Sequence, residues 1–268
     1  MIKSIKELGE KELYGKKILL RVDFNVPIEN GKISETYRIK ANKETINFLI
    51  NHGAVIGFVS HITAIDSFGP ISNQIKEVLG VDFNFVSDCV GESVETSLNS
   101  AKPGDTFLLE NVRKYEGEEK NDINFAENLA KPFDLYINNA FSASHRNHAS
   151  LVAITKFLPS YAGFLLVKEI EKLSSALNMP EGRKTLILGG AKIETKVPVI
   201  KNFLDKAENI LIGGAIANVF LKAKNIDIKK SLTDDNFLPE AKKLLEKNSH
   251  IIIPEDYVMA DELILDIG

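Results

Sequence analysis

Cationic side chains follow several apolar segments in the first half of the chain. His61, Arg113 and Arg146 each come shortly after a run rich in Val, Ile, Leu or Tyr, and Arg38 opens an amphipathic segment. Guanidinium groups bind carboxylates and phosphates through paired N–H donors. A single Arg or His is usually a solvated or structural residue, but several at the strand ends of one sheet indicate a site for a small polyanion.

Two polar residues, Asp23 and Asn25, come directly after the first apolar segment, within RVDFNVP (21–27). If that segment is a strand, both side chains lie on one side at its carboxyl end, where open α/β sheets bind ligands. They could then hydrogen-bond a substrate hydroxyl. Asp, Asn and Pro are also common turn residues, so simple turn formation is the alternative interpretation.

A pair of glycines in the second half precedes two lysines, in GGAKIETK (189–196). Glycine lets a backbone approach phosphates closely, and a helix N-terminus offers unpaired N–H groups. Lys192 and Lys196 are four residues apart, so we expect them on one helical face, where an anion between them would relieve their repulsion. A glycine turn with solvated lysines is the alternative, because the pattern is neither G-x-G-x-x-G nor G-x-x-x-x-G-K-[ST].

Short apolar segments alternate with amphipathic ones along the whole chain. The Val-, Ile- and Leu-rich segments predict strands that are covered on both faces, at 17–22, 54–60, 82–86, 106–110, 134–138, 185–188, 209–212, 250–253 and 262–265. Near-helical spacing of apolar residues predicts helices at 38–52, 125–130, 192–203, 215–221 and 238–247. Pro198 can kink or break the third of these. The alternation predicts βαβ units and parallel sheets.

A helical pattern at 163–177 separates the two sets of strands, and Met-Pro-Glu-Gly at 179–182 follows it. Helices rarely continue through Pro, and this tetrapeptide is typical of a loop. We therefore predict an α/β fold with two Rossmann-like parallel-sheet domains joined by a long helix. The first domain would span 1–160, the connecting helix and hinge 161–180, and the second domain 181–268.

The composition is that of an ordinary globular protein, with 268 residues, 44% hydrophobic, 26% charged and a formal net charge of −4. This slightly acidic balance argues against a nucleic-acid partner. No apolar run approaches the ~20 residues that a membrane helix needs, and the charged N-terminus is unlike a signal peptide. The single cysteine, Cys89, excludes an internal disulfide. We expect a cytoplasmic protein without a membrane partner.

Motifs in both halves resemble the phosphoglycerate kinase family. They are RVDFNVP (21–27), RIKA (38–41), SH (60–61), LLENVR (108–113), NNAFSASHRNHAS (138–150), GGAKIETK (189–196) and IGGAIAN (212–218), in the family's order. The resemblance implies reversible phosphoryl transfer between 1,3-bisphosphoglycerate and ADP, giving 3-phosphoglycerate and ATP. It further implies Mg²⁺ bound with ATP or ADP, and a monomer whose partners are these small molecules.

The resemblance also implies a role for individual residues. Those that would bind 3-phosphoglycerate are Asp23 and Asn25 at its hydroxyl and carboxylate end, Arg38 at the carboxyl oxygens where transfer occurs, and His61, Arg113 and Arg146 at its phosphate. Those that would bind the nucleotide are Gly190, Ala191, Lys192, Lys196, Gly213 and Gly214. Arg38 and Lys192 would be catalytic, because they would stabilise charge on the transferring group. None of the chain's residues is expected to bind the metal directly.

The sequence departs from the family's pattern at two motifs. The family reads SHLGRP where this chain has Thr63 and Ala64 after the SH pair, so a glycine and a phosphate-binding Arg are replaced. The family's NDAFG corresponds here to a stretch with Asn139 and Ser142, which removes an acid and another glycine. Loss of one charge-assisted contact would weaken substrate binding roughly ten- to a hundredfold.

In the family the sequence continues past ILDIG (264–268), so we expect the second domain to be incomplete and the chain alone to have little activity. A separate C-terminal fragment could complete it. The alternative function is that of a non-catalytic phosphoglycerate-binding relative or an inactive fragment. A nicotinamide-binding Rossmann protein is a third interpretation, which the missing G-x-G-x-x-G disfavours.

Overall fold

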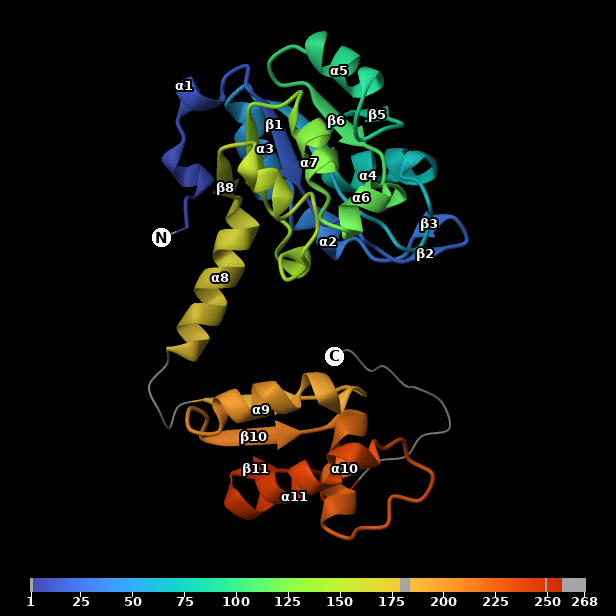
Figure 1. The fold of residues 1–268 in the computed structure, drawn as a ribbon, viewed down its shortest axis with the longest axis vertical. Coiled ribbons are helices and arrows are strands. Elements are labelled where there is room, and N and C mark those ends of the chain that lie inside the picture. The colour runs from blue at the N-terminus through green and yellow to red at the C-terminus, as the bar shows by residue number, and fades with distance from the viewer. Residues whose placement is uncertain (1, 179–183, 249, 257–268) are drawn as a thin grey trace. The chain divides into compact units, whose positions relative to one another are not determined.

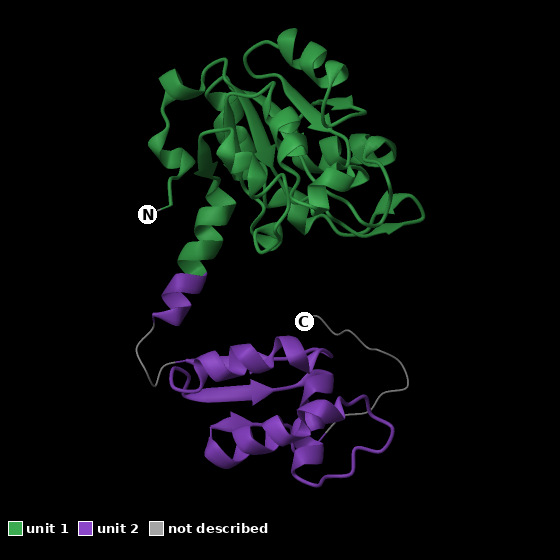
Figure 2. Cartoon of the chain, in the orientation of Figure 1, with its two compact units in different colours: residues 1–172 green, residues 173–268 purple. Residues whose placement is uncertain are grey.

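The computed structural model describes residues 2–178, 184–248 and 250–256. The chain forms two compact units, residues 1–172 and 173–268 (Figure 2). Helix α8 (Phe164–Leu177) is continuous across the boundary between them. That boundary lies within the predicted connecting segment, 161–180, whose own limits remain a proposal.

Six parallel strands form the sheet of the first unit, in the order β5-β6-β4-β1-β7-β8 (Figure 1). They are β1 (Lys17–Arg21), β4 (Val55–Val59), β5 (Asn84–Val86), β6 (Thr106–Leu109), β7 (Leu135–Asn138) and β8 (Ser160–Ala162). Five of them lie within predicted strand segments. The edge strand β8 and a short antiparallel hairpin, β2 (Ile28–Glu29) with β3 (Lys32–Ile33), were not predicted, because segments of two or three residues carry too little periodicity.

Helices cover both faces of this sheet, because successive strand residues point to opposite sides. In β1, Ile18 and Leu20 pack into one apolar cluster and Leu19 packs into another. The first cluster includes residues from α2 (Tyr37–Lys40), α3 (Lys43–Asn51) and α4 (Ser72–Leu79); the second includes residues from α5 (Glu92–Asn99) and α7 (Ile123–Ala130). The short helices α1 (Glu10–Leu13) and α6 (Glu116–Glu119) complete the unit. The sheet is therefore buried on both faces, as the unalternating apolar segments predicted.

The predicted helix 38–52 is wrong as a single element, because the structure divides it into α2 and α3. The Nδ2 atom of Asn42 donates 2.8 Å to the carbonyl of Arg38, which a regular helix would bond through the Asn42 backbone N–H. That N–H instead bonds the carbonyl of Ile39 at 3.1 Å. The sequence analysis also missed α4 and α5, although Ile75 and Leu79 have the i, i+4 spacing of a buried helical face.

Three parallel strands form the sheet of the second unit, in the order β11-β10-β9. The elements are β9 (Thr185–Leu188), α9 (Val197–Phe203), β10 (Asn209–Ile212), α10 (Gly214–Ala223), α11 (Leu238–Lys247) and β11 (Ile251–Ile252). The predicted strand 262–265 lies outside the described residues. Parallel sheets with intervening helices in both units confirm the α/β fold class.

The predicted helix 192–203 is also wrong as a single element. A 3₁₀ helix (Ile193–Thr195) precedes α9, and Pro198 lies in the first turn of α9. Pro lacks a backbone N–H and suits the start of a helix, so the regular helix begins only at Val197. Lys192 has extended backbone angles and Lys196 lies just before α9, so the two lysines do not share one helical face.

Candidate anion-binding site

Loops from four neighbouring strands of the first unit gather at one edge of its sheet. The strands β1, β4, β6 and β7 are parallel, so all four end at the same edge. The predicted binding residues follow these ends: Asp23 and Asn25 after β1, His61 after β4, Arg113 after β6 and Arg146 after β7. This is where α/β sheets hold ligands. The structure thus brings together residues that are up to about 120 positions apart in the chain.

His61 is a buried, neutral hydrogen-bond donor at this edge. Its Nδ1 lies 3.1 Å from Nη2 of Arg21, which can only donate, so Nδ1 accepts and Nε2 carries the proton. Burial, together with the positive charges of Arg21, Arg113 and Arg146, lowers the pKa of His61 from 6.5 to about 2. The charges of Arg113 and Arg146, both predicted to bind phosphate, contribute to this lowering. The three side chains therefore lie close enough to interact electrostatically.

Arg113 carries donors that no described residue uses. Its Nε lies 3.3 Å from Oε1 of Glu119, yet neither Nε nor Nη2 forms a hydrogen bond, although both atoms are buried. The side chain is only 15% exposed. Burial and the charge of Arg146 lower the pKa of Arg113. Buried polar groups are nearly always paired, so these donors favour an anionic ligand at this position.

A buried polar network supports the basic cluster from behind. Arg21, 1% exposed, donates from Nε to Oγ of Ser150 at 3.1 Å, and from Nη1 to the carbonyl of Val22 at 2.8 Å. Ser150 in turn donates from Oγ at 2.6 Å and from N at 2.8 Å to the carboxylate of the fully buried Glu118. The guanidinium of Arg21 is therefore linked to a buried countercharge.

The sequence analysis did not predict the buried network that links Arg21, Glu118 and His148. Nδ1 of His148 lies 3.7 Å from Oε1 of Glu118, and burial lowers the pKa of this imidazole while Glu118 opposes the shift. The signal for Arg21 was present, since a charged residue ended an otherwise apolar strand, KILLR. Nothing local marked Glu118, which lies among the acidic residues of α6.

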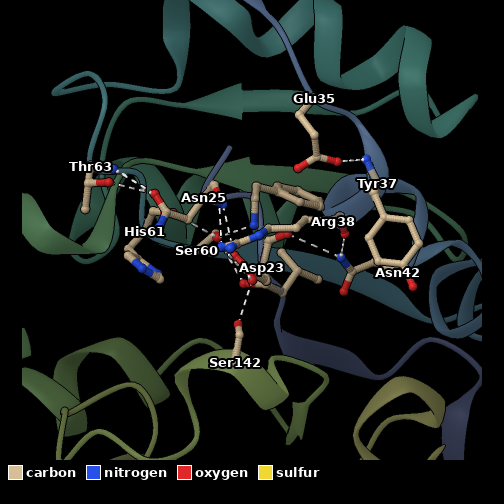
Figure 3. Close-up of polar contacts among 12 residues, drawn as sticks. Asp23, Asn25, Glu35, Tyr37, Arg38, Asn42, Ser60, His61, Thr63 and Ser142 are labelled. Atoms are coloured by element: carbon tan, nitrogen blue, oxygen red, sulfur yellow. Dashed lines mark hydrogen bonds and ion pairs between the residues drawn. The ribbon is translucent and has the colours of Figure 1, made fainter. Parts of the chain in front are cut away.

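Arg38 lies beside both residues that were predicted to contact the substrate's hydroxyl end (Figure 3). Its Nη1 is 3.5 Å from Oδ2 of Asp23 and donates 3.2 Å to the carbonyl of Asn25. The backbone N–H of Asn25 donates to Oδ1 of Asp23 at 3.0 Å, which is the hydrogen bond of a turn. Asp23 and Asn25 therefore form a turn and also lie together beside Arg38. Asp23 and Arg38 line a cavity of about 210 Å³ with Tyr37, Phe141 and Ser142, among others.

The loops after β1 and β4 are tied together by Ser60. Its Oγ donates to the carbonyl of Val22 at 2.9 Å and accepts from the backbone N–H of Phe24 at 3.0 Å. Ser60 thereby holds the loop that carries His61 against the loop after β1. Arg38 contacts that same β1 loop, so Arg38 and His61 lie on neighbouring loops (Figure 3). Ala64, which replaces the family's phosphate-binding Arg, is exposed and contributes no donor from its side chain.

Asn139, which stands where the resemblance places an acid, is part of a neutral buried network. Its Oδ1 accepts from Oγ1 of Thr45 at 2.9 Å and from the backbone N–H of Leu165 at 3.1 Å. Its Nδ2 donates to Oδ1 of Asn42 at 2.8 Å. Asn139 thus caps the start of α8 and connects it, through Asn42, to the carbonyl of Arg38.

In the second unit, the two predicted glycine turns contact each other. Gly190 and Gly214 have φ angles of +125° and +60°, and a Cβ on Gly214 would lie 2.8 Å from the backbone N of Gly190. The turn after β10, Gly213–Gly214, is held by a bond from N of Gly213 to O of Leu188 at 2.7 Å. Lys196 approaches the other turn, Gly189–Gly190, since its Cε is 3.9 Å from where a Cβ of Gly190 would be. Ala191 and Lys192 are exposed beside it.

Within residues 2–178, 184–248 and 250–256, no three or more His, Cys, Asp or Glu side chains gather in an arrangement that could hold a metal ion. None of the helices in those ranges combines the length and apolar character needed to cross a membrane.

The lowered pKa of His61 predicts a loss of stability in mild acid. The native imidazole stays neutral down to about pH 2, whereas in the unfolded chain it takes up a proton below about 6.5, so protons favour unfolding. Between about pH 7.5 and 5.5 this linkage should lower the free energy of unfolding by about 1.3 kcal/mol. His61→Asn keeps an acceptor for Arg21 and should remove that difference in urea unfolding at the two pH values. An equal loss of stability in parent and variant would show that His61 is not the group responsible.

Two α/β units with parallel sheets, one of them carrying a basic cluster at the carboxyl edge of its strands, place the chain among the two-domain α/β proteins. The chain matches the family profile described as "Phosphoglycerate kinase" over residues 8–266. It is 42% identical over 270 residues to the phosphoglycerate kinase of Moorella thermoacetica, covering 97% of this chain and 69% of that protein. For the phosphoglycerate kinase of Prochlorococcus marinus the identity is 42%, with 97% and 68% covered. The chain belongs to the phosphoglycerate kinase family.

Solved structures agree with this assignment. The crystal structure of phosphoglycerate kinase from Pyrococcus horikoshii OT3 matches with a TM-score of 0.86 at 29% identity, over 94% of this chain and 67% of that one. The structure of phosphoglycerate kinase from Coxiella burnetii gives 0.79 at 31% identity, over 95% and 66%. The chain thus spans about two thirds of the length of these relatives. The resemblance noted in the sequence is confirmed, and the chain is a member of a family of phosphotransferases.

Proposed function

We propose that the first unit binds 3-phosphoglycerate and that the protein transfers a phosphoryl group reversibly between 1,3-bisphosphoglycerate and ADP. The observation that carries this proposal is the pair of buried, unpaired donors on Arg113, within the same electrostatic environment as Arg146 and the neutral His61. Donors of this kind suit a phosphate group. Family membership supplies the identity of the phosphorylated acid.

The arrangement of the site supports an orientation for the substrate. The phosphate would contact Arg113, Arg146 and Nε2–H of His61, while Asp23 and Asn25 would contact the hydroxyl. The carboxyl group would then lie at Arg38, which is half-exposed and therefore able to meet the transferring group. Such residues act by positioning and by electrostatic stabilisation, without a covalent enzyme intermediate.

The second unit would bind ADP or ATP at its paired glycine turns, Gly189–Gly190 and Gly213–Gly214. The start of α10 and the side chain of Lys196 lie at these turns and are suited to phosphate oxygens. Lys192 would act on the transferring group. Mg²⁺ would arrive with the nucleotide, whose phosphates it neutralises. A monomeric state and a cytoplasmic location remain predictions from the sequence.

The proposal is tested by titrating the whole chain with 3-phosphoglycerate in a calorimeter and by assaying ADP-dependent turnover. Turnover should be measured for the chain alone and after addition of the remaining C-terminal segment of a relative such as the Moorella thermoacetica protein. We expect saturable binding in both cases and turnover that is greater in the mixture. Absence of 3-phosphoglycerate binding would refute the proposed substrate.

One observation favours a second candidate, a non-catalytic phosphoglycerate-binding relative. Ala64, which is exposed and has no charged group, stands where the resemblance places a phosphate-binding Arg. Binding of 3-phosphoglycerate without turnover, even in the mixture, would support this candidate over the kinase.

A further inference from the structure

Two hydroxyl residues stand where the family has glycine, and each of them contacts one of the residues at the substrate's hydroxyl end. Thr63 donates to Oδ1 of Asn25 from both its backbone N and its Oγ1, each at 3.0 Å. Ser142 donates from Oγ to Oδ2 of Asp23 at 2.6 Å. Figure 3 shows these two contacts approaching the site from different loops. The two replacements therefore change the surroundings of one and the same pair of residues.

The contacts of Thr63 determine which atom of Asn25 faces outward. A backbone N–H can only donate, so the atom that it contacts must be the amide oxygen of Asn25. With two donors, both lone pairs of that oxygen are occupied. Nδ2 of Asn25 has no hydrogen-bond partner within the described residues, so the side chain offers the site only N–H donors.

The contacts of Ser142 leave Asp23 as an acceptor. A carboxylate has about four acceptor positions. Three donors already approach it: N of Asn25 at Oδ1, and Oγ of Ser142 and Nη1 of Arg38 at Oδ2. The remaining position is on Oδ1. Asp23 therefore offers one acceptor position and Asn25 one donor group.

We propose that Thr63 and Ser142 are positioning residues that make Asp23 and Asn25 selective for a hydroxyl group. A hydroxyl can accept from Nδ2 of Asn25 and donate to Asp23 through the same oxygen. A keto oxygen can only accept, and an ammonium group can only donate. The inference rests on the proposed function, since it concerns the hydroxyl at carbon 2 of 3-phosphoglycerate. Neither hydroxyl side chain touches the substrate in this role.

The test compares two ligands and four variants of the whole chain by calorimetric titration. The ligands are 3-phosphoglycerate and 3-phosphooxypropionate, which lacks only the hydroxyl. Thr63→Val and Ser142→Ala should each raise the Kd for 3-phosphoglycerate about three- to tenfold, because one orienting hydrogen bond is lost. Neither should change the Kd for 3-phosphooxypropionate. Thr63→Ser, which keeps the hydroxyl, should restore parental binding. Thr155→Val makes the same chemical change on an exposed residue whose hydroxyl bonds only the carbonyl of Val152, and should have no effect.

The results separate the inference from the function on which it rests. If the parent chain binds 3-phosphoglycerate but Thr63→Val and Ser142→Ala weaken both ligands equally, the residues merely support the loops and the inference is wrong. Unchanged affinity for both ligands would overturn it as well. If the parent does not bind 3-phosphoglycerate at all, the proposed function fails, and the inference fails with it.

Discussion

Replacing Arg113 with Ala is expected to weaken binding of 3-phosphoglycerate by about two orders of magnitude. Nε and Nη2 of this side chain are buried and form no hydrogen bond within the described structure, so they are available to two phosphate oxygens. Each charge-assisted hydrogen bond contributes about 1.5–3 kcal/mol, and two of them at the lower end of that range, about 3 kcal/mol together, correspond to roughly a hundredfold in Kd. Calorimetric titration of the whole chain measures the change directly.

The same substitution should leave the stability of the unliganded protein almost unchanged. Burial lowers the pKa of Arg113 most, and the charges of Arg146 and Arg21 lower it further, so the free site contains repulsion between these guanidinium groups. The ion pair with Glu119 compensates weakly, because Glu119 is 60% exposed. Thermal midpoints without ligand should therefore be similar, whereas 3-phosphoglycerate should raise the midpoint of the parent far more than that of Arg113→Ala.

Two controls separate the forked geometry of Arg113 from its charge. Arg113→Lys keeps the charge but loses the planar fork, so about a tenfold loss of affinity is expected. Lys131→Ala removes one positive charge from an exposed ion pair with Glu95 and should leave Kd unchanged. An Arg113→Ala variant that bound 3-phosphoglycerate as tightly as Lys131→Ala would remove the main support for the proposed substrate orientation.

The second large effect is expected on folding, from Glu118→Ala. Glu118 is completely buried and accepts three contacts, from N and Oγ of Ser150 and from His148. Its removal leaves the guanidinium of Arg21 buried without the countercharge that Ser150 connects to it. Removing one partner of a buried charge pair usually destabilises a protein by about 3–5 kcal/mol. We expect a loss of that size in the first unit.

Urea unfolding followed by hydrogen-exchange mass spectrometry measures this loss separately for peptides of the first unit, which matters because a two-unit chain need not unfold in one step. Glu119→Ala is the matched control, because the neighbouring carboxylate is mostly exposed and should contribute within about 0.5 kcal/mol. Glu118→Gln keeps the shape without the charge and should fall between the two. Equal stability of the Glu118→Ala and Glu119→Ala variants would contradict a structural role for the buried network.

Local sequence patterns were sufficient to predict the features that are set by residues close together in the chain, namely most strands and the residues at their ends. Unalternating apolar segments predicted most of the strands of both sheets, because a parallel strand is buried on both faces and needs apolar residues throughout. The placement of His61, Arg113 and Arg146 after such segments predicted that they would meet, since parallel strands end at one edge. The order of the motifs was sufficient to predict the family. The roles of these residues in binding and catalysis remain predictions.

The tertiary structure alone decided which polar groups are paired and which are free. Arg21, Ser150 and Glu118 are widely separated in the chain, so no local pattern could show that they form one buried network. The break between α2 and α3 depends on the hydrogen bond from the side chain of Asn42 to the carbonyl of Arg38. The break before α9 depends on the position of Pro198 in the first turn of that helix. Residue types reveal what a side chain can donate or accept, but a hydrogen bond forms only when folding brings its two partners within about 3 Å. The unused donors of Arg113 and the oriented amide of Asn25 became visible for that reason.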